Sequence, residues 1–90
     1  MRAITAEVLR QTAEITDVEV RRDIADTQAE IEGYERRLVG LEEQAAHGAD
    51  LAERKLAWFR SGAVRHEIEQ RREFVDYLER LLVARQEKHG

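Results

Sequence analysis

The residues with the most distinctive chemistry lie between positions 54 and 66. This segment carries four basic side chains and no acidic one, and Trp58 and Phe59 stand among them. Basic side chains beside aromatic rings can bind a phosphate backbone and stack on bases. The residues for such binding to nucleic acid are Arg54, Lys55, Arg60 and Arg65. The same segment could instead contact a protein, because Trp, Phe and Arg are also enriched at protein interfaces. A purely structural interpretation also stays open, in which Trp58 packs on the end of the preceding helix and the arginines balance acidic charge.

Three carboxylates, Asp23, Asp26 and Glu30, share one face of a predicted helix and resemble a metal or acid–base cluster. Helices that bind metals through carboxylates usually add a Glu-x-x-His pair, and no glutamate here is followed by histidine three residues later. The histidines are not spaced to share a metal ion on consecutive helical turns: His47, His66 and His89. We therefore interpret the carboxylates as a solvated acidic face and predict no metal and no cofactor.

Nucleophilic catalysis has no support in the sequence. Ser61 is the only serine, and its neighbours Arg60 and Gly62 do not form the strained strand-to-helix turn that exposes a nucleophilic serine. The five glycines are too scattered for a phosphate-binding loop. We predict no catalytic residues and a protein that is not an enzyme.

The composition favours helices throughout the chain. Ninety residues make one small domain, and 38% of them are charged while none is proline or cysteine. The net charge of −4 is unevenly spread. Residues 1–50 hold six basic and twelve acidic side chains, whereas residues 51–90 hold nine and seven. If the two halves lie side by side, these opposite excesses attract each other.

Targeting signals are not evident in the chain. The first sixteen residues have no apolar stretch of signal-peptide length, and no segment approaches a membrane span. We expect a cytoplasmic protein without a membrane partner.

Three helix starts follow from capping chemistry. Thr5 precedes a helical run, Thr16 and Glu19 form a T-x-x-E capping box, and Asp50 and Glu53 form a D-x-x-E box. Gly48 suits the left-handed residue that ends a helix, so one helix ends and the next begins near it. The predicted helices cover about 6–14, 17–47 and 51–87, with a kink at Ser61-Gly62. If the capping signals before residue 20 are accidental, residues 1–47 form one continuous helix instead.

The first long helix carries a coiled-coil pattern. Apolar residues recur with alternating spacings of four and three, and charged residues fill most positions between them. This narrow stripe consists of Val20, Ile24, Thr27, Ile31, Tyr34, Leu38, Leu41 and Ala45. Such a seam is typical of a helix that pairs with one other helix.

The second long helix is apolar over a broader sector. Its members are Leu56, Val64, Ile68, Phe74, Val75, Leu78, Leu81 and Leu82, with Phe59 and Tyr77 at one side. Leu51, Trp58 and Val83 lie largely opposite. Because a narrow seam cannot cover a broad sector, we expect the N-terminal helix to cover part of it. The remainder predicts contact with another copy of the chain or with a different protein.

The sequence therefore predicts an all-α fold, an antiparallel two-helix coiled-coil-like hairpin with a short additional N-terminal helix. The favoured function is a non-enzymatic interaction or assembly factor, of the adaptor, chaperone or inhibitor type. We expect it to form a homodimer or higher homo-oligomer and to bind an unidentified protein. The predicted contact residues are Trp58, Phe59, Phe74, Tyr77 and Leu81. The alternative is a nucleic-acid-associated factor, such as a phage packaging or regulatory component, that uses the basic segment.

Overall fold

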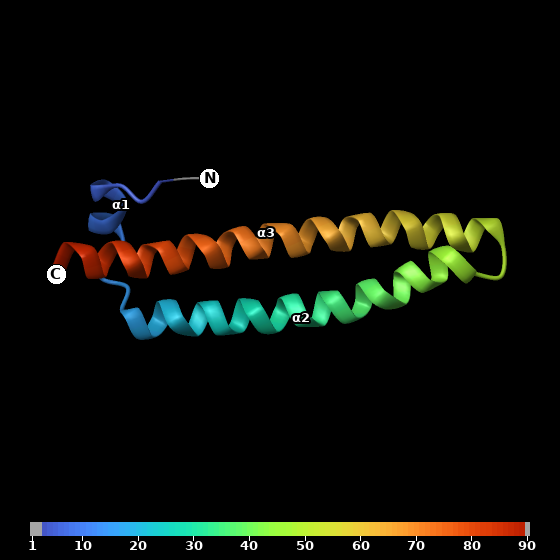
Figure 1. The fold of residues 1–90 in the computed structure, drawn as a ribbon, viewed down its shortest axis with the longest axis horizontal. Coiled ribbons are helices and arrows are strands. Elements are labelled where there is room, and N and C mark those ends of the chain that lie inside the picture. The colour runs from blue at the N-terminus through green and yellow to red at the C-terminus, as the bar shows by residue number, and fades with distance from the viewer. Residues whose placement is uncertain (1–2, 90) are drawn as a thin grey trace.

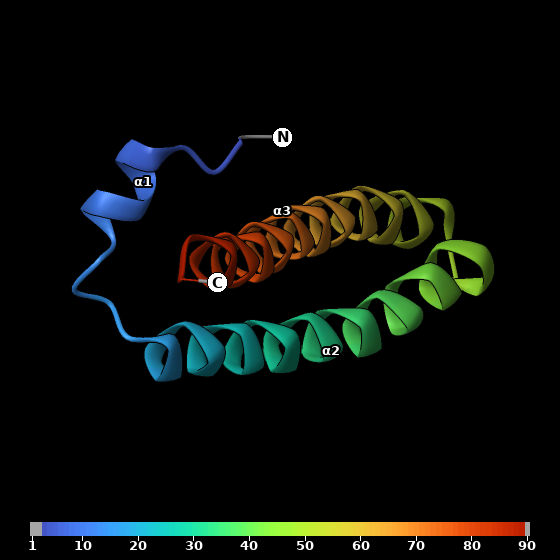
Figure 2. The same cartoon turned by 60° about the vertical axis from the view of Figure 1, so that its left-hand side comes forward.

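The computed structural model describes residues 3–89, and side chains over residues 3–87, as three helices without a strand in that range. They are α1 (Ala6–Gln11), α2 (Asp17–His47) and α3 (Leu51–His89). Helices α2 and α3 run antiparallel along a rod of 59 × 21 × 18 Å (Figures 1 and 2). Helix α1 lies by the C-terminal end of α3, on the side away from α2 (Figure 1). The predicted all-α hairpin with a short N-terminal helix is confirmed.

The predicted helix starts are also confirmed. The Thr5 hydroxyl accepts a hydrogen bond from the Val8 amide at 3.2 Å. At Thr16 the capping box is complete: the hydroxyl accepts from the Glu19 amide at 3.1 Å, and the Glu19 carboxylate accepts from the Thr16 amide at 3.0 Å. The chain therefore breaks before α2, and the alternative of one continuous helix over residues 1–47 is wrong.

Two helix ends differ from the predicted ones. Helix α1 ends at Gln11 rather than near residue 14. Beyond Thr12 the backbone forms turns, since the Ala13 amide donates to the Arg10 carbonyl at 3.3 Å and the Ile15 amide to the Thr12 carbonyl at 3.0 Å, each only three residues back. Helix α3 continues to His89 instead of ending near residue 87. The side chain of His89 lies outside the described residues.

Replacing Thr16 with alanine is expected to lower the free energy of unfolding by about 1 kcal/mol, because the first turn of α2 loses its cap. Thr16 is exposed, so no packing is lost at the same time. Urea denaturation measures the change. Thr16→Asn is the matched control, since asparagine also accepts from the third amide of a helix. If both variants lose the same stability, the cap is not the cause.

Gly48, between the two long helices, does not have the predicted left-handed backbone conformation. Its φ and ψ are −57° and 154°, and its amide donates to the Gln44 carbonyl at 2.8 Å. This backbone suits any residue, so conformational freedom does not explain the glycine. A Cβ atom there would lie 2.6 Å from the Gln44 oxygen and 3.0 Å from Cγ of Arg54. Close approach of the two helices therefore requires glycine at this turn.

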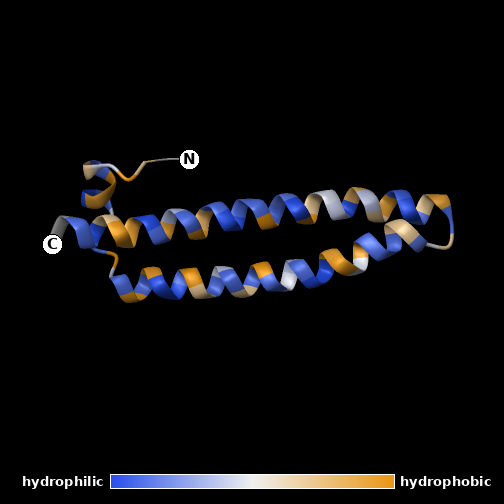
Figure 3. Cartoon of the chain, viewed as in Figure 1, coloured by the Kyte–Doolittle hydropathy of each residue, from blue (hydrophilic) through white to orange (hydrophobic). Residues whose placement is uncertain are grey.

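The seam predicted for α2 is the one that packs against α3. Val20, Thr27, Ile31 and Leu41 are buried. The other apolar members are partly buried against α3, whereas Val39, one position from the seam, is 65% exposed. Figure 3 shows hydrophobic residues along the facing sides of both long helices and at the end of α3 beside α1.

The seam of α3 is narrower than the predicted broad sector. It repeats with alternating spacings of four and three along Ala57, Ser61, Val64, Ile68, Arg71, Val75, Leu78 and Leu82. Ala57 and Ser61 are 3% and 1% exposed, whereas the predicted member Leu56 is 51% exposed. Near the turn, the side chains of α3 that are buried against α2 are therefore small ones. The chain does not recap at Ser61-Gly62 as predicted: α3 continues through it as one helix, and the Ser61 hydroxyl donates to the Trp58 carbonyl of the same helix at 2.7 Å.

Ion pairs join the acidic first half of the chain to the basic second half. Arg65 lies 3.2 Å from Glu42, and Arg72 lies 3.7 Å from Glu35. These carboxylates belong to α2 and the guanidinium groups to α3. All four side chains are about half exposed, so each pair contributes less than about 1 kcal/mol. Their role is to favour one alignment of the hairpin.

Candidate interaction surface on α3

The aromatic side chains of α3 remain in solvent although the seam with α2 is complete. Trp58 is 61% exposed, Phe59 66% and Phe74 46%. The Trp58 and Phe59 rings contact each other edge to face, with centroids 5.1 Å apart and planes at 76°. Tyr77 is partly buried. Four of the five predicted contact residues are therefore at least partly accessible.

Leu81 is not accessible, which corrects its assignment as a contact residue. It is 2% exposed and forms a buried cluster with Val20 and Leu78. The partly buried Ile4, Val8 and Leu9 from the N-terminal segment pack against this cluster. The short helix thus covers the C-terminal end of the sector that the sequence left unpaired, and Leu81 belongs to the core of the chain.

Arg85 of α3 holds the N-terminal segment at this end of the hairpin through two hydrogen bonds. One of its terminal nitrogens, Nη2, donates to the Thr12 carbonyl at 2.6 Å, and the other, Nη1, donates to the Asp17 carboxylate at 2.7 Å. The Arg85 side chain is only 13% exposed. The link between α1 and α2 is therefore held against α3, and α1 keeps its position over Leu81.

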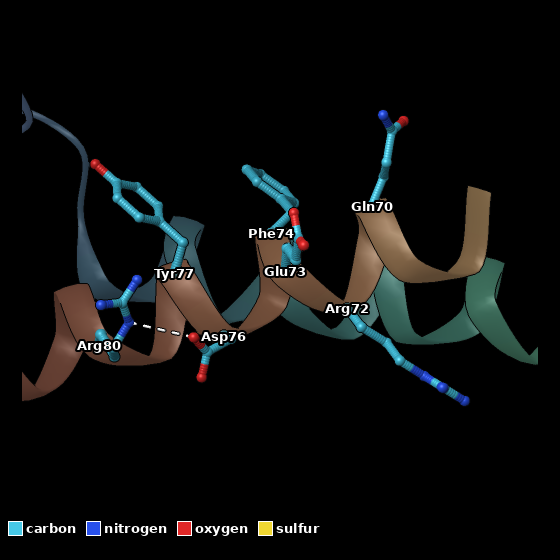
Figure 4. A pocket seen from close by; sticks show the side chains of 7 residues that line it. All are labelled: Gln70, Arg72, Glu73, Phe74, Asp76, Tyr77 and Arg80. Atoms are coloured by element: carbon cyan, nitrogen blue, oxygen red, sulfur yellow. Dashed lines mark ion pairs between the residues drawn. The ribbon is translucent and has the colours of Figure 1, made fainter. Parts of the chain in front are cut away.

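A second line of side chains, which we call the outer stripe, follows α3 on the side that α2 does not cover. Successive helical residues are about 100° apart, so spacings of three and four keep residues on one side. The outer stripe consists of Leu56, Phe59, Ala63, Gln70, Phe74 and Tyr77. Figure 4 shows Gln70, Phe74 and Tyr77 pointing to the same side of α3. The spacing of these residues can be read from the sequence. Which of the apolar residues of α3 are buried and which stay exposed is decided only by where α2 packs.

A shallow groove runs along the C-terminal part of this stripe (Figure 4). Phe74 and Tyr77 form its apolar part. Charged side chains border it, among them Glu73 and Arg80, and Nε of Arg80 lies 3.2 Å from the Asp76 carboxylate. An apolar strip with charged borders is typical of a surface that contacts protein.

The four basic residues of segment 54–66 do not form one basic surface. Arg54 donates to the Gly48 carbonyl at 3.2 Å, and Arg65 pairs with Glu42 at 3.2 Å. Both side chains therefore form contacts within the hairpin. Lys55 and Arg60 are exposed and form no ion pair among the described residues. They lie on opposite borders of the outer stripe, because five residues of helix separate them by about 140°.

Arg71 occupies a position in the middle of the α3 seam. Its Nε donates to the Glu30 carboxylate of α2 at 2.8 Å, it also pairs with Glu67, and its guanidinium lies 4.6 Å from the centre of the Tyr34 ring. The hydrogen bond to Glu30, followed by that to Glu67, raises the pKa of the Arg71 guanidinium. Arg71 is thus a fixed positive charge that joins the helices. Glu30, one of the three clustered carboxylates, is one of its partners.

The described part of the chain holds neither a metal site nor a membrane-spanning helix. Residues 3–87 contain no group of three His, Cys, Asp or Glu side chains placed to hold a metal ion. Within the same part, no helix has both the length and the apolar character needed to cross a bilayer. The surface that stands out is the exposed aromatic one on α3.

Comparisons with protein-family models, with curated proteins and with solved structures find no match to this chain.

Proposed function

We propose that this protein is a non-enzymatic interaction or assembly factor that self-associates and presents α3 to a protein partner. The observation that carries the proposal is the exposure of Trp58, Phe59 and Phe74 on a helix whose seam is already filled. Burial of one large apolar side chain is worth about 1.5–3 kcal/mol. A surface with several of them on one helix therefore gains by contact with another apolar surface.

The nucleic-acid alternative is less well supported by the same geometry. Two of its four residues, Arg54 and Arg65, are engaged within the hairpin. Net charge over the chain is −4, which opposes approach to a phosphate backbone. The two functions differ in their response to salt. Binding to a phosphate backbone weakens steeply between low and physiological salt, whereas an apolar protein contact changes little.

Replacing Phe59 or Phe74 with glutamate is expected to weaken self-association by at least about tenfold, because a charge must then be desolvated in the contact. Both positions are exposed, so the fold should be retained. Sedimentation over a wide concentration range measures association, and circular dichroism checks helicity.

The matched control is Val39→Glu, which places the same charge at an equally exposed apolar position on α2. We expect it to leave association unchanged. A protein that stays monomeric at high micromolar concentration would contradict the proposed self-association. Equal weakening by all three variants would contradict its location on α3.

A further inference from the structure

The free part of the outer stripe has a defined length. The N-terminal segment packs on the buried cluster that contains Leu81, and Tyr77, about one helical turn before Leu81, packs on the same cluster. The outer side of α3 is therefore covered from about residue 77 onward. At the other end α3 begins at Leu51. Residues 51–76 are therefore free on that side, over about 38 Å at about 1.5 Å per residue. The midpoint of this free length falls between Ala63 and Val64.

Charges on the two borders of the stripe are arranged about the same midpoint. Arg60 and Glu67 lie on the border nearer α2, three or four residues to either side of it. Lys55 and Glu73 lie on the opposite border, about nine residues to either side. Lys55, Arg60 and Glu73 are exposed and form no ion pair among the described residues. Those three charges have no ion-pair partner within the described chain, whereas Glu67 already pairs with Arg71 of its own helix.

We infer that the outer stripe binds a second copy of this chain, with the two α3 helices antiparallel about a two-fold axis at Ala63–Val64. This inference rests on the self-association proposed above and specifies its geometry. In such a pair, residues on one border of a helix face the same border of its partner. Arg60 of each copy then faces Glu67 of the other, and Lys55 faces Glu73. Both opposite-charge pairs meet in this register, and in the pair Lys55–Glu73 neither group has another ion-pair partner among the described residues.

The residues at the axis fit a close crossing of two helices. Gly62 and Ala63 are small and exposed, and a Cβ atom at Gly62 would meet nothing within 4 Å. Away from the axis, Phe74 of each copy faces Ala52 and Leu56 of the other. A shift of the second copy toward the C-terminal end of α3 would drive it into α1. The position of α1 therefore limits shifts in that direction, and the border charges select this register.

The register is tested by crosslinking through single cysteines, because the natural chain has none. With a short bismaleimide, Ala63→Cys should give a covalent dimer, since the two copies of residue 63 meet at the axis. Gln70→Cys is the matched control on the same stripe. Its two copies are about 20 Å apart along the helices, because each lies about 10 Å from the axis, so it should not crosslink.

Charge reversal tests the pairing independently. Lys55→Glu and Glu73→Lys should each weaken dimerisation on the order of tenfold, because each places like charges together twice in a two-fold dimer. The double variant should return to within about threefold of the natural protein, as opposite charges meet again. Glu43→Lys, the same change on an exposed position of α2, should have no effect.

The outcomes separate this geometry from the proposed function. A dimer that crosslinks through residue 70 rather than 63, or in which the double variant is no stronger than either single one, overturns the geometry and leaves self-association standing. A chain that is monomeric at high micromolar concentration overturns both.

Discussion

Replacing Leu81 with alanine is expected to lower the free energy of unfolding by about 2–5 kcal/mol, the range for a leucine removed from a packed core. Leu81 is 2% exposed and joins Val20 of α2 to Leu78 of α3. The N-terminal segment packs on the same cluster, so its anchoring weakens together with the hairpin. Urea denaturation followed by circular dichroism measures the loss.

Val83→Ala is the matched control for Leu81. Val83 lies two residues further along α3 and is 52% exposed. Truncating an exposed side chain changes stability by less than about 0.5 kcal/mol. If the two variants lose similar stability, α1 does not cover Leu81 in solution, and that end of α3 is available for partner contact after all.

Replacing Ser61 with leucine is expected to lower the free energy of unfolding by about 1–3 kcal/mol, because the larger side chain overpacks the seam. Ser61 is 1% exposed and Ala57, one helical turn earlier, is 3% exposed, so this part of the α3 seam is built from small, fully buried side chains. Ser61→Ala is the informative companion. It removes only the hydroxyl, which donates to the Trp58 carbonyl of its own helix, so we expect a change of less than about 1 kcal/mol.

A control for the added volume is Ala46→Leu, at an exposed position of α2, which should leave stability within about 0.5 kcal/mol. The opposite order, with Ser61→Ala costing more than Ser61→Leu, would mean that the hydroxyl rather than the size of the residue matters. The hairpin seam would then be looser near the turn than the structure shows.

Local chemistry in the sequence determined where the helices begin. The cap at Thr16 uses a side chain and an amide three residues apart, and neither depends on distant parts of the chain. The seam of α2 was equally predictable, because its apolar residues recur with spacings of four and three and charged residues fill most positions between them. These features are fixed by spacing along a single helix, and spacing is what a sequence records directly.

Only the tertiary structure decided which side of α3 meets α2. By hydrophobicity, Leu56 is a better candidate for burial than Ser61, yet Leu56 is 51% exposed and Ser61 is 1% exposed. The physical reason is the direction in which each side chain points: Ser61 lies in the seam that faces α2, whereas Leu56 lies on the outer stripe, which α2 does not cover. Hydrophobic pattern alone does not record which side of α3 the chain turns toward α2.

The candidate interaction surface was also predictable only in part. The sequence identified Trp58, Phe59 and Phe74 as unusual, because aromatic residues beyond a filled seam need a further surface. It could not show that Leu81 is covered while Phe74 is free, since both belong to the same apolar sector. That difference depends on where α1 packs, because the chain turns between α1 and the start of α2. The position of this six-residue helix is set by contacts with residues some seventy positions away.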